Sequence, residues 1–338
     1  MRNVLRRRPL VSVILPSFNH APFVAEAVGS VLDQSLRDLE LIVVDDASTD
    51  ATPEIVGALR DPRLTLLRLP ANRAVHPRNL ALSRARGRYV AFQNSDDIWR
   101  PGKLERQVEA MESRDRPAAC FTRAETVDAE GRPTGGDLAE KLLSHEERPA
   151  AAWLRRFFDI GNCLIISSAM VRRSDLVALG GFRASLVQLG DFDLWVRMAA
   201  LGAFRILPEP LTLWRILGEA NLSHPSPTTR NRAQIELAQI LEHYAAPPLL
   251  GLLDRIFPEI PADAPPGARR IALALRAVGR PGSGFSLFAD RVIAAVLDDA
   301  AARAEAVAHH GTGFLRDFLA RRGRSEFRQI PETELPSA

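Results

Sequence analysis

The chain has 338 residues, enough for one medium-sized domain with an appendage or for two domains. Its 44 Lys and Arg residues nearly balance 41 Asp and Glu residues, and the formal net charge is +3. This balance excludes a strongly basic nucleic-acid-binding protein, so we expect no nucleic-acid partner. No stretch approaches the roughly 20 consecutive apolar residues of a membrane-spanning helix.

The cysteines and the N-terminus bear on the location of the protein. Cys120 and Cys163 lie in apolar segments without a Cys/His cluster, which is typical of reduced core thiols in a cytoplasmic protein. The basic run at residues 2–8 is followed by Pro9 rather than by the apolar region of a signal peptide. We expect residues 1–9 to form a basic tail of a cytoplasmic protein. Peripheral contact with anionic lipid at the inner face of a membrane stays open.

From residue 10 the hydrophobic pattern alternates between strands and helices. Short apolar runs predict buried strands at 10–15, 41–44, 64–69, from 89, 118–122 and from 164, and an extended segment at 204–214. Apolar residues at helical spacing predict helices at 21–34, 77–86, from 101 and from 191. Residues 128–150 have the composition of an excursion or mobile loop. The alternation predicts an α/β fold with a mostly parallel, Rossmann-like sheet flanked by helices.

Short groups that contain polar side chains follow three of the predicted strands. They are Phe18–Asn19 after the first, Asp45–Asp46 after the second and Asn94–Asp96 after the strand from residue 89. Each group alone is also typical of a turn. Because the carboxyl ends of parallel strands meet at one edge of a sheet, where ligands bind, three such groups favour a ligand site.

Six short motifs resemble those of family 2 glycosyltransferases, which are inverting enzymes with a GT-A fold. In chain order they are VSVILPSFN (11–19), LIVVDDASTD (41–50), PRN (77–79), NSDDIWRP (94–101), GGF (180–182) and GDFDLW (190–195). The resemblance covers roughly residues 10–223, which we take as the glycosyltransferase domain. Residues 224–338 form a helical C-terminal region, with helices predicted near 230–246, 266–278, 285–308 and 312–323.

The resemblance implies roles for individual residues. Asp96 matches the ligand of a divalent cation, Mn²⁺ or Mg²⁺, that neutralises the donor diphosphate. Asp191 matches the general base that deprotonates the acceptor hydroxyl, while Asp193 is expected to be a helix-surface or structural carboxylate. The donor-binding positions implied are Pro16, Phe18, Asn19, Asp46, Arg78, Asn94, Ser95, Asp96 and Gly181.

Simpler interpretations of these residues stay open. Asp191 also has the chemistry of a helix N-cap, and Arg78 that of a solvated arginine at a helix start. Gly181 would suit a plain tight turn as well as a close approach to a sugar. Three positions depart from the family pattern, with Asn94 and Gly190 in place of acids and Leu217 in place of a histidine. These departures leave reduced activity or another donor preference open.

The resemblance implies an inverting glycosyltransferase that transfers a sugar from a nucleotide-diphosphate donor to a glycan or lipid-linked acceptor. A UDP-sugar is the first candidate donor. Two alternatives remain. A non-catalytic nucleotide-binding or scaffold protein would explain the three departures. A sugar nucleotidyltransferase would need a glycine-rich phosphate loop after the first strand, and Pro16-Ser17-Phe18-Asn19-His20 offers none.

The last predicted helix carries an apolar face. Phe314, Leu315, Phe318 and Leu319 fall at i, i+1, i+4 and i+5. This face must be buried against the same chain, a second protomer in a homodimer, or a membrane surface.

Overall fold

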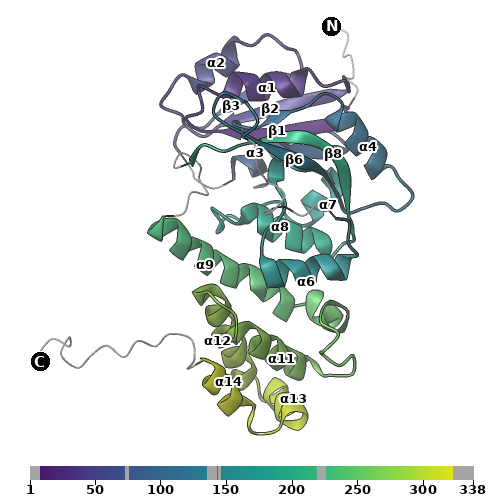
Figure 1. Ribbon diagram of the computed structural model, residues 1–338, viewed down its shortest axis with the longest axis vertical. Helices are drawn as coiled ribbons and strands as arrows, with labels where there is room; N and C mark the ends of the chain where they lie inside the picture. The colour runs from purple at the N-terminus through teal and green to yellow at the C-terminus, as the bar shows by residue number, and fades with distance from the viewer. Residues whose placement is uncertain (1–7, 73–75, 135–142, 144–145, 219–225, 323–338) are drawn as a thin grey trace, which may run out of the picture. The chain divides into compact units, whose positions relative to one another are not determined.

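The computed structural model describes residues 8–72, 76–134, 143, 146–218 and 226–322 (Figure 1). These residues form two compact units that divide between Ser226 and Pro227. Residues 1–7 of the basic tail, residues 135–142 and 144–145 of the expected excursion, and residues 219–225 lie outside the described residues.

An eight-stranded mixed sheet forms the centre of the N-terminal unit, in the order β3-β2-β1-β4-β7-β6-β8-β5. The strands are β1 (Val11–Ser17), β2 (Leu39–Asp45), β3 (Leu64–Arg68), β4 (Tyr89–Phe92), β5 (Ile98–Trp99), β6 (Ala119–Val127), β7 (Ala169–Arg172) and β8 (Phe204–Arg215). The first four strands of the sheet order run parallel, β7 is antiparallel to both neighbours, and β8 is parallel to β6. The expected α/β class with parallel strands flanked by helices is confirmed.

Helices cover both faces of this sheet (Figure 1). They are α1 (Val24–Leu32), α2 (Thr52–Ala58), α3 (Pro77–Arg84), α4 (Lys103–Met111), α6 (Ala150–Ile160), α7 (Arg173–Ala178) and α8 (Gly190–Ala199). Alternate residues of β1, including Val11 and Val13, share one apolar cluster with α1 and α4. On the opposite face Phe121 of β6 contacts Trp195 of α8, with ring centroids 4.9 Å apart. The period-two pattern of the strands therefore supplies two cores, as a buried sheet requires.

Two sequence expectations for the segment before α7 need correction. The strand expected from residue 164 begins only at Ala169, because Ile166–Ser168 forms a 3₁₀ turn closed by the Ser168 N–H on Ile165 O at 3.1 Å. Helix α6 was not predicted. Its buried residues, Trp153, Leu154, Phe157 and Phe158, have helical spacing, so the sequence did carry the signal.

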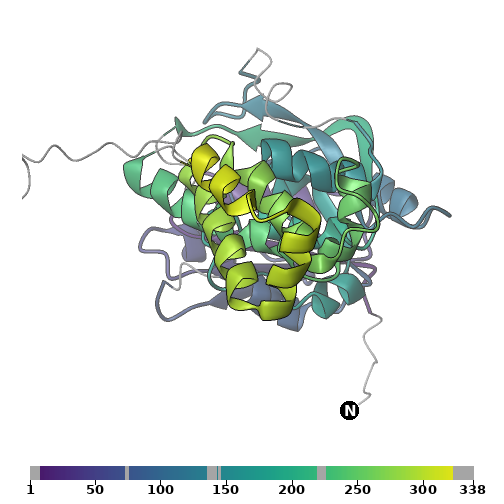
Figure 2. The same ribbon diagram turned by 90° about the horizontal axis from the view of Figure 1, so that it is seen from below.

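Helices make up the described part of the C-terminal unit. The α-helices are α9 (Pro227–Leu241), α10 (Leu253–Ile256), α11 (Pro266–Val278), α12 (Ser283–Asp298), α13 (Ala300–His310) and α14 (Phe314–Arg322). Figure 2 shows the last four, in yellow-green, gathered in one bundle. The single helix expected at 285–308 is wrong: Asp299 separates α12 from α13, because its carboxylate accepts the N–H groups of Ala301 and Ala302 as an N-cap.

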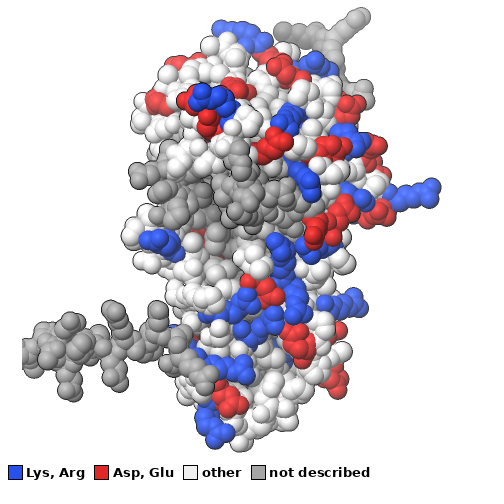
Figure 3. Space-filling model, viewed as in Figure 1, with Lys and Arg blue, Asp and Glu red and all other residues white. Residues whose placement is uncertain are grey.

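The apolar face of α14 is largely buried inside this unit. Phe314 and Phe318 are each 4% exposed, and α14 packs against α11, whereas Leu319 stays 58% exposed. Basic and acidic side chains are interspersed on the face shown in Figure 3. One ion pair of the C-terminal unit joins Arg291 to Glu242 at 2.6 Å. Among the described residues, no helix combines the length and apolar character needed to cross a membrane.

Candidate active site

The loops that follow β1 and β2 are bound to each other. Asn19 adopts a left-handed conformation, with φ of 52°, and its side-chain oxygen accepts the Thr49 N–H at 2.8 Å. The Asn19 N–H in turn donates to Ser48 Oγ at 2.9 Å, and the Asp46 N–H donates to Ser17 O at 2.8 Å. Asn19 thus connects the two loops through its own backbone and side chain.

This loop pair presents one apolar and one acidic residue. Phe18 is 42% exposed, which is unusual for a large apolar side chain at a strand end. Asp46 is buried, while its neighbour Asp45 accepts the backbone N–H and hydroxyl of Ser48 and so forms the turn. Pro16 lies in β1, opposite Val44 of β2. A nucleotide-reading role for Phe18, Pro16 and Asp46 stays a prediction.

The loop after β4 is organised by the carboxylate of Asp97, which is 1% exposed. Its Oδ2 accepts the Ser167 hydroxyl and the side-chain N–H of Asn94 at 3.1 Å. Its Oδ1 accepts the Arg215 backbone N–H at 3.0 Å. Burial and the nearby charge of Asp96 raise the pKa of Asp97, whereas these donors stabilise its ionised form.

Asp96 is partly exposed at the tip of the same loop. Burial raises its pKa, and the positive charges of Arg215 and Arg78 oppose that shift. Among the described residues, no other side chain donates a hydrogen bond to its carboxylate, and no three His, Cys, Asp or Glu side chains gather as a metal centre. A single available carboxylate fits Mg²⁺ or Mn²⁺, which complete their shell with waters and phosphate oxygens.

Ser95 lies between Asn94 and Asp96 in this loop and is 3% exposed. Its hydroxyl is 2.7 Å from Nδ1 of His20, whose backbone N–H donates to Thr52 Oγ1 at 2.9 Å. Burial lowers the pKa of His20, which favours the neutral imidazole. The Ser95 hydroxyl therefore connects the acidic loop to the loop after β1, and its contact with a donor stays a prediction.

Arg78 is the second residue of α3, and its side chain contacts the acidic loop. One guanidinium nitrogen donates to Asn94 Oδ1 at 2.8 Å, and the guanidinium carbon lies 5.7 Å from the Phe182 ring centroid. Burial lowers the pKa of Arg78, and the carboxylates of Asp191 and Asp96 oppose that shift. Its Nε is buried and has no hydrogen-bond partner among the described residues. Arg78 is thus not a solvated surface arginine, and it has an N–H group free for an anionic ligand.

Asp191 is the second residue of α8 and is held at both carboxylate oxygens. Oδ1 accepts the Phe192 N–H at 2.7 Å, and Oδ2 accepts the side-chain N–H of Asn162 at 3.0 Å. Burial raises its pKa, while the Phe192 N–H and the charge of Arg78 oppose the shift. The cap position itself is occupied by Leu189, so Asp191 is not the N-cap.

The neighbours of Asp191 differ from it in environment. Asp193 is fully buried and pairs with Arg197 at 2.6 Å and Arg183 at 3.3 Å, in agreement with the structural role expected. At Gly190 an added Cβ would lie 3.6 Å from the His76 ring, an ordinary contact distance. The glycine at this position is therefore not enforced by space.

The turn before α8 is fixed to α3. Gly181 has φ of 69°, and an added Cβ would lie 2.6 Å from Asn79 Oδ1. That oxygen accepts the Phe182 N–H at 2.9 Å, and Asn79 Nδ2 donates to Phe182 O at 2.8 Å. Position 181 therefore needs glycine because the backbone there lies close to Asn79. The hydrogen bonds of Asn79 to Phe182 hold the Phe182 ring beside Arg78. Contact of Gly181 with a sugar stays a prediction.

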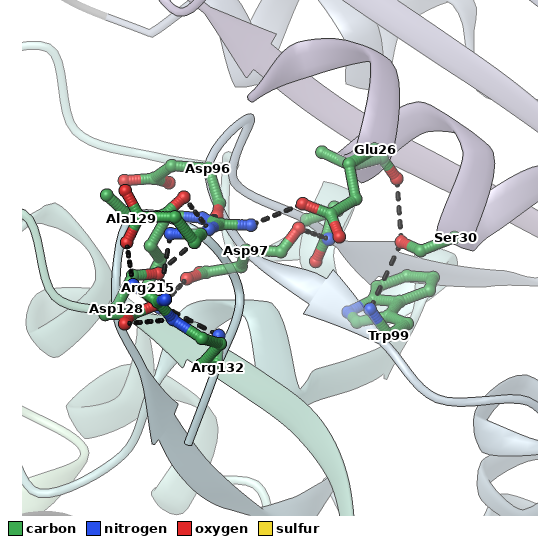
Figure 4. A network of polar contacts seen from close by, with 12 residues as sticks. Glu26, Ser30, Asp96, Asp97, Trp99, Asp128, Ala129, Arg132 and Arg215 are labelled. Atoms are coloured by element: carbon green, nitrogen blue, oxygen red, sulfur yellow. Dashed lines mark hydrogen bonds and ion pairs between the residues drawn. The ribbon is translucent and has the colours of Figure 1, made fainter. Parts of the chain in front are cut away.

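Arg215, at the end of β8, joins that strand to three other segments around the acidic loop (Figure 4). It is 1% exposed. Its guanidinium donates to one carboxylate and three backbone oxygens: Glu26 Oε2 at 2.5 Å, Asp96 O at 2.8 Å, Asp128 O at 2.9 Å and Ala129 O. Arg215 therefore fixes the backbone on which the Asp96 carboxylate stands.

Several residues that contact the predicted site residues had no role predicted from the sequence. Ser167, Asn162 and His20 each contact a residue predicted to be functional, from segments distant in the chain. Arg215 stands two residues before Leu217, one of the positions that depart from the family pattern, and no role was predicted for it. The only sequence signal for Asn162 is a polar residue that follows Gly161.

Comparison with known proteins identifies the class. The family model described as glycosyl transferase family 2 matches residues 12–176. The chain belongs to glycosyltransferase family 2.

Two curated relatives illustrate the range of the similarity. TuaG of Bacillus subtilis (strain 168), provisionally named a teichuronic acid biosynthesis glycosyltransferase, is 46% identical over 129 residues, 37% of this chain and 51% of TuaG. WfgD of Escherichia coli, named UDP-Glc:alpha-D-GlcNAc-diphosphoundecaprenol beta-1,3-glucosyltransferase, is 44% identical over 103 residues, 30% of this chain and 41% of WfgD. The match spans about half the length of these relatives or less.

Solved structures extend the similarity in fold. S. aureus TarS 1–349 in complex with UDP-GlcNAc superposes with a TM-score of 0.58 at 19% identity, covering 94% of this chain and 93% of that chain. The mannosyltransferase PcManGT from Pyrobaculum calidifontis, in complex with GDP-Man and Mn²⁺, gives a TM-score of 0.51 at 21% identity, covering 95% and 89%. The expected GT-A fold with a helical C-terminal extension is confirmed.

We predict that Arg215→Gln lowers the unfolding free energy of the N-terminal unit by about 3 kcal/mol, because buried acceptors lose a charged donor. All four tryptophans lie in this unit, so urea unfolding followed by tryptophan fluorescence reports on it. Arg106→Gln is the matched control. It removes the solvent-exposed ion pairs of Arg106 with Glu109 and Glu209, and should leave the unfolding free energy nearly unchanged. Equal losses in both variants would contradict the central position of Arg215.

Proposed function

We propose that the protein is an inverting glycosyltransferase. It would transfer a sugar from a nucleotide-diphosphate donor to a hydroxyl of a glycan or lipid-linked acceptor, and a UDP-sugar is the first candidate donor. One observation carries the proposal. The charges of Asp191 and Asp96 oppose the fall in the pKa of Arg78 that burial causes, while Arg78 donates to Asn94 Oδ1 at 2.8 Å. A candidate cation ligand, a candidate phosphate-binding group and a candidate base therefore belong to one electrostatic cluster at the carboxyl edge of the sheet.

The donor assignment draws on residues and relatives together. Phe18 offers an exposed aromatic face beside the buried carboxylate of Asp46, a combination that suits a nucleobase. WfgD is named for UDP-Glc, and the TarS structure contains UDP-GlcNAc. The unpartnered Nε–H of Arg78 is suited to a phosphate oxygen, to which arginine binds with a planar pair of donors.

The metal assignment rests on the chemistry of the acidic loop. Asp96 would hold Mn²⁺ or Mg²⁺, since Asp97 is already occupied by three donors. When bound, the cation neutralises charge that develops on the departing diphosphate. PcManGT, which shares the fold, is in complex with Mn²⁺.

In the proposed reaction the acceptor oxygen attacks the anomeric carbon as its bond to the diphosphate oxygen breaks. The hydroxyl proton passes to the Asp191 carboxylate, and the bonding electron pair leaves with the nucleoside diphosphate. Asn162 and the Phe192 N–H orient the carboxylate, and Arg78 stabilises the charge on the leaving group. A single displacement inverts the anomeric centre.

A non-catalytic nucleotide-binding protein is the second candidate, favoured by Asn94, Gly190 and Leu217. The two candidates differ in turnover. A nucleotide that binds while no donor is consumed, with or without acceptor, would favour the second. Lipid-linked acceptors are the first choice for a screen, since WfgD is named for a diphosphoundecaprenol acceptor. Such an acceptor would bring the protein to the inner face of a membrane.

We predict that Asp191→Asn lowers kcat by about 10²–10⁴-fold, the usual contribution of a general base, and leaves donor affinity nearly unchanged. The measurement is steady-state transfer combined with calorimetry of donor binding. Asp175→Asn on α7, a carboxylate 3.6 Å from Arg172, is the control and should retain activity. Full activity of Asp191→Asn would exclude Asp191 as the base.

The pH dependence gives a separate prediction. A base must be ionised, so kcat/KM falls as pH falls through the pKa of Asp191, which burial places above the ~4 of a free aspartate. Asn162→Ala removes a hydrogen bond that favours the ionised form, so the acid limb should move to higher pH. Arg78 and the Phe192 N–H remain in the variant. An acid limb that does not move would show that Asn162 does not act on the base.

We further predict that Mn²⁺ tightens UDP binding through Asp96. In Asp96→Asn the difference between Kd values with and without Mn²⁺ should shrink by about tenfold or more, as expected when a metal ligand is lost. Calorimetry measures this without turnover. Asp115→Asn, in which the carboxylate is 79% exposed, is the control. Retention of the whole Mn²⁺ effect in Asp96→Asn would place the cation elsewhere.

A further inference from the structure

We propose that Asn94 is a positioning residue whose amide group ties Arg78 to Asp97, so that the loop carrying Asp96 is ordered without a negative charge at position 94. The assignment rests on the proposed function, because the roles of Arg78 and Asp96 in ligand binding are those of the proposed reaction. It differs from the simplest interpretation of the sequence, in which Asn94 is a metal ligand that has lost its charge.

The hydrogen bonds around Asn94 have a fixed direction. Its Oδ1 accepts from Arg78 at 2.8 Å, and its Nδ2 donates to Asp97 Oδ2 at 3.1 Å. A guanidinium group only donates and a carboxylate only accepts, so the orientation of the amide follows from its partners. The Asn94 backbone N–H donates to Ser167 Oγ at 3.1 Å, and that hydroxyl donates to Asp97. The side chain of Asn94 thus binds the buried carboxylate of Asp97 directly, and its backbone N–H binds the Ser167 hydroxyl that donates to the same carboxylate.

A carboxylate at position 94 could accept from Arg78 but could not donate to Asp97. It would place two like charges in the contact that Nδ2 now makes at 3.1 Å, beside the third carboxylate of Asp96. Asp97 is 1% exposed and is held by Ser167 and the Arg215 N–H, so it cannot turn to water. The asparagine removes this repulsion and replaces it with a hydrogen bond.

The neutral amide also affects Arg78. An added carboxylate would bind the guanidinium as an ion pair and compete with an anionic ligand for its donors. With Asn94 the contact is a single hydrogen bond to an amide oxygen, and within the described part of the chain the Nε of Arg78 has no partner. Asn94 therefore orients Arg78 while leaving its charge available.

The test compares Asn94→Asp with the wild type, first by thermal unfolding without metal or nucleotide. Tryptophan fluorescence reports on the N-terminal unit, and Tm should fall by about 5 °C. Adding Asp97→Asn to Asn94→Asp restores a donor opposite the new carboxylate and should recover part of the loss. If the single variant does not fold, recovery of folded protein in the double variant supports the same conclusion.

The second measurement is transfer at saturating Mn²⁺, where Asn94→Asp should raise the donor KM by about tenfold because Arg78 is displaced or neutralised. Gln34→Glu is the matched control outside the site. Gln34 is a buried amide that donates to Ser30 O and Arg100 O and accepts the Leu104 N–H. That variant should lower Tm and leave the donor KM unchanged.

An Asn94→Asp variant that melts at or above the wild-type Tm without metal would overturn the proposal, as would a double variant no more stable than the single one. A lower donor KM in Asn94→Asp would show that the position is a weakened ligand site instead. If the wild type transfers no sugar at all, the proposed function fails, and the unfolding comparison still decides the role of Asn94.

Discussion

The candidate site depends on the burial of one carboxylate, that of Asp97. A charge removed from water must be met by hydrogen-bond donors, or it destabilises the fold. Here the donors come from three places: the loop itself through Asn94, the 3₁₀ turn through Ser167, and the end of β8 through the Arg215 N–H. Satisfying Asp97 therefore fixes three segments that are far apart in sequence, and Asp96 is held next to them.

Arg215 is the main hydrogen-bond donor of the same network, whereas Asp97 is its main acceptor. Its guanidinium is buried and saturates backbone oxygens that no strand partner reaches, including Asp96 O and Asp128 O (Figure 4). Arginine suits this position because its donors spread in a plane and it stays charged when desolvated. The acidic loop is thus rigid in its backbone, while Asp96 and Arg78 keep groups for a ligand. Rigid support with free functional groups is what an electrostatic site requires.

The parts of this structure that follow from local pattern could be predicted from the sequence. The parallel strands, the strand ends at Asn19, Asp46 and Asp96, and the glycine turn before α8 belong to this group. Helix α6 could also have been predicted from the helical spacing of its apolar residues. The contacts of Asn162, Ser167 and Arg215 were not, because each depends on where a distant segment passes in the fold. Asn94 shows the limit most clearly: its residue type suggests a lost charge, and only its position beside Asp97 shows a donor.

Electrostatics links the two halves of the candidate mechanism. The cluster contains the carboxyl groups of Asp96, Asp97 and Asp191 against the guanidinium groups of Arg78 and Arg215, and burial raises the pKa of all three acids. A diphosphate adds further negative charge, so its binding without a counter-ion would be opposed. A divalent cation at Asp96 would remove that opposition and favour the ionised carboxylates. A phosphate bound to Arg78 in its present orientation would offset the positive charge that now stabilises the Asp191 carboxylate, and Asp191 would become the stronger base. In the proposed reaction, donor binding and activation of the base are therefore coupled through a single arginine.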